Sequence, residues 1–122
     1  MIIKYVEFTS EEAAILIPIV NAVITLHENV FERTIEYLDV KKLAFLEEMV
    51  EMLQDGIDLN LDVVIEVTEY YYYELQLLKD ILIDMSALFE PVVRESYISI
   101  AVKFDKVIQY YSQCKGVNKL CK

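Results

Sequence analysis

Four glutamates occur at a spacing that could bind a divalent metal ion. Glu48 and Glu51 stand three residues apart, and Glu66 and Glu69 repeat that spacing further along the chain. Residues three apart on a helix are surface neighbours, so each pair could present two carboxylates together. Carboxylate oxygens are the side-chain ligands that magnesium prefers. The pattern therefore raises a magnesium site as one hypothesis for this chain.

The two pairs resemble the E-x-x-E…E-x-x-D pattern of the all-α nucleotide pyrophosphohydrolases of the MazG kind, with Glu69 where that family has Asp. The resemblance covers only these two segments, and it implies magnesium-assisted attack on a nucleoside triphosphate. On a helical wheel, however, Glu48 and Glu66 lie opposite the apolar faces of their helices, and Glu51 and Glu69 lie at the flanks. Metal ligands in a helical bundle project inward. We therefore interpret the four as a solvated acidic face and keep the enzyme as an alternative.

The histidine and the cysteines do not match a known site. A ferritin-like di-iron site needs an E-x-x-H on each of two helices, and the single histidine, His27, has Ile24 in the glutamate position. Cys114 and Cys121 include no C-x-x-C, which argues against zinc. Cys114 falls on an apolar stripe, so we predict a buried thiol and not a nucleophile paired with His27. With only two glycines and no phosphate-loop motif, we predict no catalytic residue and no cofactor.

Four consecutive tyrosines, residues 70–73, are the strongest indication of function. On a helix, Tyr71 and Tyr72 would face the core, whereas Tyr70 and Tyr73 would face outward. Tyrosine suits a protein interface because it contributes apolar area at low entropic cost and keeps a polar tip. Two further apolar side chains share the outer side. The predicted interface consists of Val63, Tyr70, Tyr73 and Leu77.

Composition predicts one folded, acidic domain over residues 1–122. The chain of 14.3 kDa is 56% hydrophobic and has a formal net charge of −10, with two glycines and two prolines. So few turn residues favour long helices over many short strands. Residues 1–90 hold 19 of the 21 acidic and 5 of the 11 basic side chains, so residues 91–122 are net positive. The acidic body argues against nucleic acid as a partner.

Apolar periodicity predicts an all-α fold, an antiparallel bundle of four helices joined by short loops. Thr9 with Glu12 forms a capping-box pattern at the first helix start. Pro18 predicts a kink in that helix, and Gly56 predicts a left-handed stop after the second. The predicted helices span residues 10–38, 40–55, 59–89 and 91–115, after a possible strand or arm over residues 1–8.

Two segments alternate like strands, residues 61–68 and 97–104, but we assign both to helices because each continues a helical stripe. The apolar run 13–26 contains Pro18 and is short of the roughly 20 residues that cross a bilayer, so we predict a buried helix and no membrane partner. That helix is apolar nearly all round and needs cover on two sides. A symmetric dimer would supply it.

These features favour a small, acidic, non-enzymatic protein of the cytoplasm that acts by binding protein, as a homodimer and with an unidentified partner. Inhibitors, chaperones, immunity proteins and viral or phage accessory proteins share this size and class. The magnesium-dependent pyrophosphohydrolase is the first alternative. The second is an acidic decoy that mimics DNA, suggested by the negative charge of residues 1–90.

Overall fold

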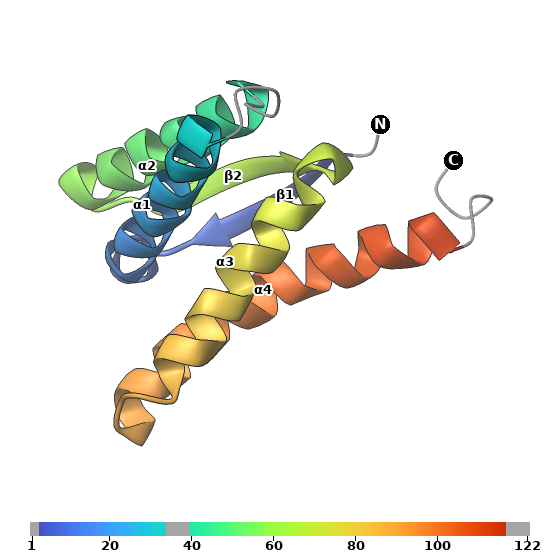
Figure 1. The fold of residues 1–122 in the computed structure, drawn as a ribbon. Helices are drawn as coiled ribbons and strands as arrows, with labels where there is room; N and C mark the ends of the chain where they lie inside the picture. Colours follow the sequence, from blue (N-terminus) through green and yellow to red (C-terminus); the bar gives the residue numbers. More distant parts are fainter. Residues whose placement is uncertain (1–2, 34–39, 117–122) are drawn as a thin grey trace. The chain divides into compact units, whose positions relative to one another are not determined.

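The structure, a computed structural model, describes residues 3–33 and 40–116 (Figure 1). These residues are mostly helical and contain four α-helices and one two-stranded antiparallel sheet. The elements in chain order are β1 (Ile3–Phe8), α1 (Ser10–Arg33), α2 (Val40–Leu59), β2 (Val63–Thr68), the 3₁₀ turn η2 (Glu69–Tyr71), α3 (Tyr72–Ser86) and α4 (Pro91–Gly116). The four helices and the N-terminal strand confirm the sequence prediction. Their packing into a single bundle stays a prediction.

The chain divides into two compact units, which are described separately. The first unit is Glu7–Ile65, in which α1 packs against α2. The second unit combines Met1–Val6 with Glu66–Lys122, and in it α3 packs against α4. Both strands of the sheet contribute residues to both units, because β1 and β2 are each cut near their middle. Each unit therefore consists of a helical hairpin and one end of the sheet.

The predicted helix 59–89 is wrong in its first third, because residues 63–68 form β2. The strand buries Val63, Ile65 and Val67 and exposes the residues between them, which is the period of two expected for a strand. Five of its six residues are β-branched, and such side chains fit a pleated surface better than a helix. The apparent helical stripe through Leu61 and Val64 consists of exposed side chains. Residues 97–104, by contrast, lie in α4 as predicted.

The start of α1 shows the predicted capping box. The Thr9 backbone N–H donates to Glu12 Oε1 at 2.9 Å, and the Glu12 N–H donates to Thr9 Oγ1 at 3.2 Å. The helix continues through Pro18 to Arg33, and residues 34–38 of the predicted helix lie outside the described chain. The kink stays a prediction.

The end of α2 corrects the predicted role of Gly56. This glycine lies inside the helix, which continues to Leu59, and it has no positive φ. The left-handed residue is Asn60, with φ 53°, and the Leu61 N–H donates to the Gly56 carbonyl at 2.9 Å across it. This is the Schellman pattern, which asparagine tolerates. Gly56 serves instead to let β2 approach, because an added Cβ would overlap Val63 Cγ2 and lie 3.1 Å from the Leu61 carbonyl oxygen.

Polar contacts hold α3 against α4 at two levels. Lys79 Nζ lies 3.3 Å from Asp105 Oδ1 in the middle of the hairpin. At the turn, Arg94 donates to the Ser86 carbonyl at 3.1 Å and to the Phe89 carbonyl at 3.0 Å, which satisfies acceptors at the end of α3. The core between the helices contains Leu75, Leu78, Leu82, Ile100, Phe104, Val107, Ile108 and Tyr111.

Candidate interaction surfaces

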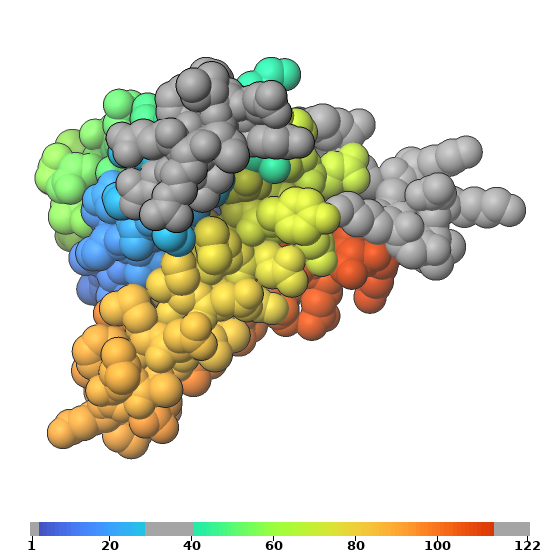
Figure 2. Space-filling model, viewed as in Figure 1, coloured from blue at the N-terminus to red at the C-terminus, as the bar shows by residue number. Residues whose placement is uncertain are grey.

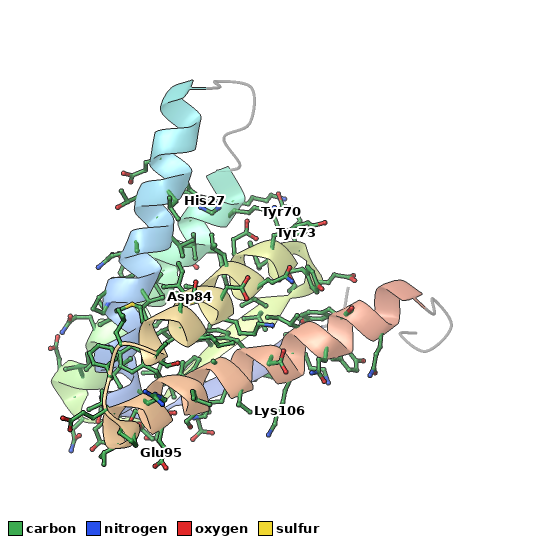
Figure 3. All side chains as sticks on the ribbon, turned by 60° about the horizontal axis from the view of Figure 1, so that its bottom comes forward. His27, Tyr70, Tyr73, Asp84, Glu95 and Lys106 are labelled. Carbon is green, nitrogen blue, oxygen red and sulfur yellow. The ribbon has the colours of Figure 1, made fainter. Side chains whose placement is uncertain are left out.

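The predicted outward pair of tyrosines is exposed at the start of the α3–α4 hairpin (Figure 3). Tyr70 belongs to η2 and is 38% exposed, and Tyr73 belongs to the first turn of α3 and is 65% exposed. Each meets a neighbouring ring edge-on: the Tyr70 and Tyr71 centroids are 5.2 Å apart, and those of Tyr72 and Tyr73 are 5.5 Å apart. Such contacts restrict the rings without burying them. Two large, oriented aromatic side chains therefore face solvent.

The other residues of the predicted interface behave differently. Val63 is buried, at 5% exposed, because it points inward from β2 and does not continue the face of α3. Its placement on an outer stripe with Tyr70 was wrong, since the two residues belong to different elements. Leu77 is half-buried on α3. Tyr71 and Tyr72, predicted to be core residues, are also half-buried, because the 3₁₀ turn replaces the first helical turn.

A second pair of tyrosines connects α4 to the sheet. The Tyr111 hydroxyl is fully buried and donates to the Val67 carbonyl of β2 at 3.0 Å. Beside it, the ammonium group of Lys4 on β1 lies 3.9 Å from the centre of the Tyr110 ring, a cation–π contact. Burial raises the pKa of Tyr111 to about 12, the negative charge of Glu69 adds to the shift, and a hydrogen bond from the Lys4 backbone opposes it. This pair is structural and holds both strands against α4.

The four glutamates of the metal hypothesis lie on three different elements. Glu48 and Glu51 are exposed on α2, Glu66 is exposed on β2, and Glu69 is half-buried in η2. The second pair therefore departs from the helical E-x-x-E pattern of the pyrophosphohydrolases. Residues three apart across a strand and a turn do not share one helical face. Among the described residues, no three His, Cys, Asp or Glu side chains form a group that could hold a metal ion.

The histidine and cysteine predictions have different outcomes. His27 is half-buried, and its Nδ1 lies 3.0 Å from the Val23 carbonyl oxygen one turn earlier in α1. The ring of His27 thus has a hydrogen-bonding partner within its own helix. Cys121 lies outside the described residues, and the side chain of Cys114 in α4 lies outside the described side chains.

The apolar helix α1 buries only one side in the structure. Its buried side chains are Ala13, Leu16, Ile19, Val20 and Val23. Ala14, Pro18, Ala22 and Leu26 are exposed, and no charged residue occurs between Glu12 and His27. By length and composition alone, Ser10–Glu28 could cross a membrane, a test that the core helix of a soluble protein also passes. The second side of α1 remains a surface that another molecule could cover.

The exposed face of α2 is acidic. Glu48, Glu51, Asp55 and Asp58 follow one another at steps of three and four residues, and all four are exposed. The first unit contains 13 of the 21 acidic and 3 of the 11 basic side chains, so it has the whole net charge of the chain. The second unit is neutral overall. The negative charge is thus concentrated on one unit, and α2 presents four of its carboxylates in one exposed row.

The structure also identifies a surface that the sequence analysis missed, the outer face of α4. Ile98 and Val102 are exposed there, and Glu95 and Lys106 project from the side of α4 that faces away from α3 (Figure 3). From residue 87 to residue 99 no side chain is buried. In Figure 2 no other segment covers the visible side of this orange end of the hairpin. The signal was present in the sequence as positions spaced three and four apart opposite the apolar stripe of residues 100, 104, 107 and 111.

Comparisons with protein-family models, with curated proteins and with solved structures found no significant match to this chain. The surfaces described above therefore provide the basis for proposing a function.

Proposed function

We propose that this chain is a non-enzymatic protein of the cytoplasm that acts by binding other proteins, with Tyr70 and Tyr73 at the centre of the contact and with a homodimer as the active form. The observation that carries the proposal is the pair of exposed rings, each oriented by an edge contact with its neighbour. Aromatic side chains that are already oriented lose little entropy on binding and are typical of interface hot spots.

The surroundings of the tyrosines favour a partner with a basic rim. Glu66 is exposed one element before Tyr70, and Glu69 is the adjacent residue. Carboxylates around an aromatic centre resemble the polar rim of protein interfaces, where charge steers encounter more than it adds affinity. The partner would thus present an apolar pocket for the rings and Lys or Arg side chains around it.

Replacing both exposed tyrosines by glutamate should abolish partner binding without unfolding the chain. We expect affinity capture from the source cell to retain proteins on the wild type that Tyr70→Glu/Tyr73→Glu loses, with partner affinity at least about tenfold weaker. Tyr5→Glu is the matched control, because Tyr5 on β1 is also 65% exposed. Equal retention by the double variant and the wild type would refute the role of this surface, and circular dichroism would verify that the helices persist.

A second candidate, an acidic decoy for a nucleic-acid-binding protein, is favoured by the carboxylate row of α2. The discriminating experiment uses the same capture with Glu48→Gln/Glu51→Gln/Asp55→Asn. A decoy would lose its partner in this triple variant and with added salt, because exposed charges are screened. It would keep the partner in the tyrosine variant.

Magnesium with a panel of nucleoside triphosphates should give no heat of binding and release no pyrophosphate. The reason is that the four candidate glutamates lie on α2, β2 and η2 and are not supported by two facing helices. Isothermal titration and a pyrophosphate assay make this measurement. Magnesium-dependent release of pyrophosphate would replace the proposed function by the pyrophosphohydrolase.

A further inference from the structure

The outer face of α4 combines two exposed apolar side chains, Ile98 and Val102, with charges of both signs on either side of them. Taking about 100° per residue, Glu95, Val102 and Lys106 lie within about 20° of the direction opposite the buried Phe104. Exposed residues on this side follow at steps of three and four, the spacing of a coiled-coil seam. They are Val92, Glu95, Ser99, Val102, Lys106, Gln109 and Gln113, with Ile98 beside them.

The charges on this face are complementary to themselves when two copies run antiparallel. A twofold axis level with the Ile100–Ala101 peptide sets Glu95 opposite the partner's Lys106, and Lys106 opposite the partner's Glu95. The same register sets Val102 opposite the partner's Ser99, a small side chain that permits close approach. The two charges are 11 residues apart, or about 16 Å along the helix, so they flank the apolar centre at Ile98 and Val102. A twofold contact requires this self-complementarity.

Net charge also favours α4 as the place where two copies meet. Each chain has a net charge of −10, so most of its surface repels a second copy. Residues 91–116 contain four basic and two acidic side chains, a net charge of +2, so two copies of this segment repel each other less than two copies of the acidic remainder do. Within this set Arg94 donates to carbonyls of its own hairpin, Lys103 and Asp105 are half-buried, and the side chain of Lys115 lies outside the described side chains. Glu95 and Lys106 are the exposed charges that flank Ile98 and Val102.

We propose that two copies of this chain associate through an antiparallel α4–α4 contact, centred on Ile98 and Val102 and fixed in register by Glu95 and the partner's Lys106. This inference rests on the homodimer of the proposed function and specifies the surface that makes it. The contact uses neither Tyr70 nor Tyr73. The tyrosine pair therefore remains available for a different protein while the dimer is formed.

Charge reversal tests the register directly. Glu95→Lys sets two lysines against each other twice in the dimer, and Lys106→Glu does the same with two glutamates. Each variant alone should dissociate the dimer, with affinity weaker by about tenfold or more. An equal mixture of the two variants should form a heterodimer of wild-type affinity, because both cross pairs are then opposite in charge. Analytical ultracentrifugation from low to high micromolar concentration makes the measurement.

The controls separate this contact from general charge effects. Asp84→Lys, at an exposed position of α3, changes the net charge as Glu95→Lys does and should leave the dimer unchanged (Figure 3). Val102→Asp should abolish self-association while the helical signal persists, because Val102 is exposed in the single chain. A dimer that survives both reversals, or a mixture no tighter than its components, overturns the α4 contact and leaves the proposed function standing. A wild type that is monomeric at high micromolar concentration overturns the homodimer itself.

Discussion

Gly56→Ala should destabilise the protein by about 2 kcal/mol, although the same change inside an exposed helix is normally stabilising by roughly 1 kcal/mol. The reason is the overlap of the new Cβ with Cγ2 of Val63, a buried β-branched side chain whose χ1 angle is restricted. Equilibrium urea unfolding measures the loss as a lower midpoint with an unchanged slope. The change in the free energy of unfolding would thus be opposite in sign to that of a glycine-to-alanine change in an ordinary helix.

A double-mutant cycle with Val63→Ala isolates the cause of this loss. Val63→Ala alone should cost about 1 to 2 kcal/mol, because it removes buried methyl groups. In that background Gly56→Ala should cost much less, since the overlapping methyl group is gone and only the 3.1 Å contact of the new Cβ with the Leu61 carbonyl oxygen remains. A coupling free energy near zero would show that Gly56 is not required for the approach of β2 to α2.

Local signals in the sequence predicted the parts of the fold that depend on neighbouring residues. The capping box of Thr9 and Glu12 is such a signal, since all its atoms lie within one helical turn. Pro91 and Gly116 likewise bound α4 within one residue of the predicted ends. The stripe of Ile100, Phe104, Val107 and Tyr111 is buried as its period predicts.

The errors concern features that depend on distant residues. β2 forms because β1, about 60 residues earlier, supplies its hydrogen-bonding partner, and no local spacing reveals that pairing. The same strand explains Gly56, which is a glycine because Val63 approaches it and not because the helix stops there. Once β2 replaces a helix, the wheel that grouped Val63 with Tyr70 no longer applies. The exposure of Tyr70 and Tyr73 nevertheless agrees with the prediction, because it depends on the positions of these residues beside the start of α3 and not on β2.

The two candidate surfaces differ in the same way, since one depends on neighbouring residues and the other on distant residues or a second chain. The tyrosine pair was found because four adjacent aromatic residues are conspicuous in any sequence. The α4 face was missed because Glu95, Ile98, Val102 and Lys106 resemble an ordinary solvated helix until the structure shows that no neighbouring element in the described chain buries them. Its significance lies in symmetry, since a charge pair with the partner subunit has no counterpart within one chain.

Alkaline pH should destabilise the protein through Tyr111. The pKa of this hydroxyl is about 12 in the folded protein against 10.0 for an ordinary tyrosine, chiefly because of burial. The folded state therefore keeps a proton that the unfolded chain releases between pH 10 and pH 12. Stability from this group is fully present below pH 10 and is lost as the pH rises toward 12, by roughly 2 to 3 kcal/mol in total. Urea unfolding at pH 8, 10 and 12 measures the fall.

Tyr111→Phe separates this effect from the other groups that titrate in the same range. At neutral pH the variant should be less stable by about 1 to 2 kcal/mol, because the buried Val67 carbonyl loses the hydroxyl that donates to it. Above pH 11 the order should reverse, since the wild type must then ionise or expose a buried phenol and the variant need not. A wild type and variant whose unfolding curves stay parallel from pH 8 to pH 12 would show that Tyr111 ionises as freely in the folded protein as in the unfolded chain. The junction of α4 with Val67 and Lys4 would then be open to water, and the second unit would depend on its α3–α4 core alone.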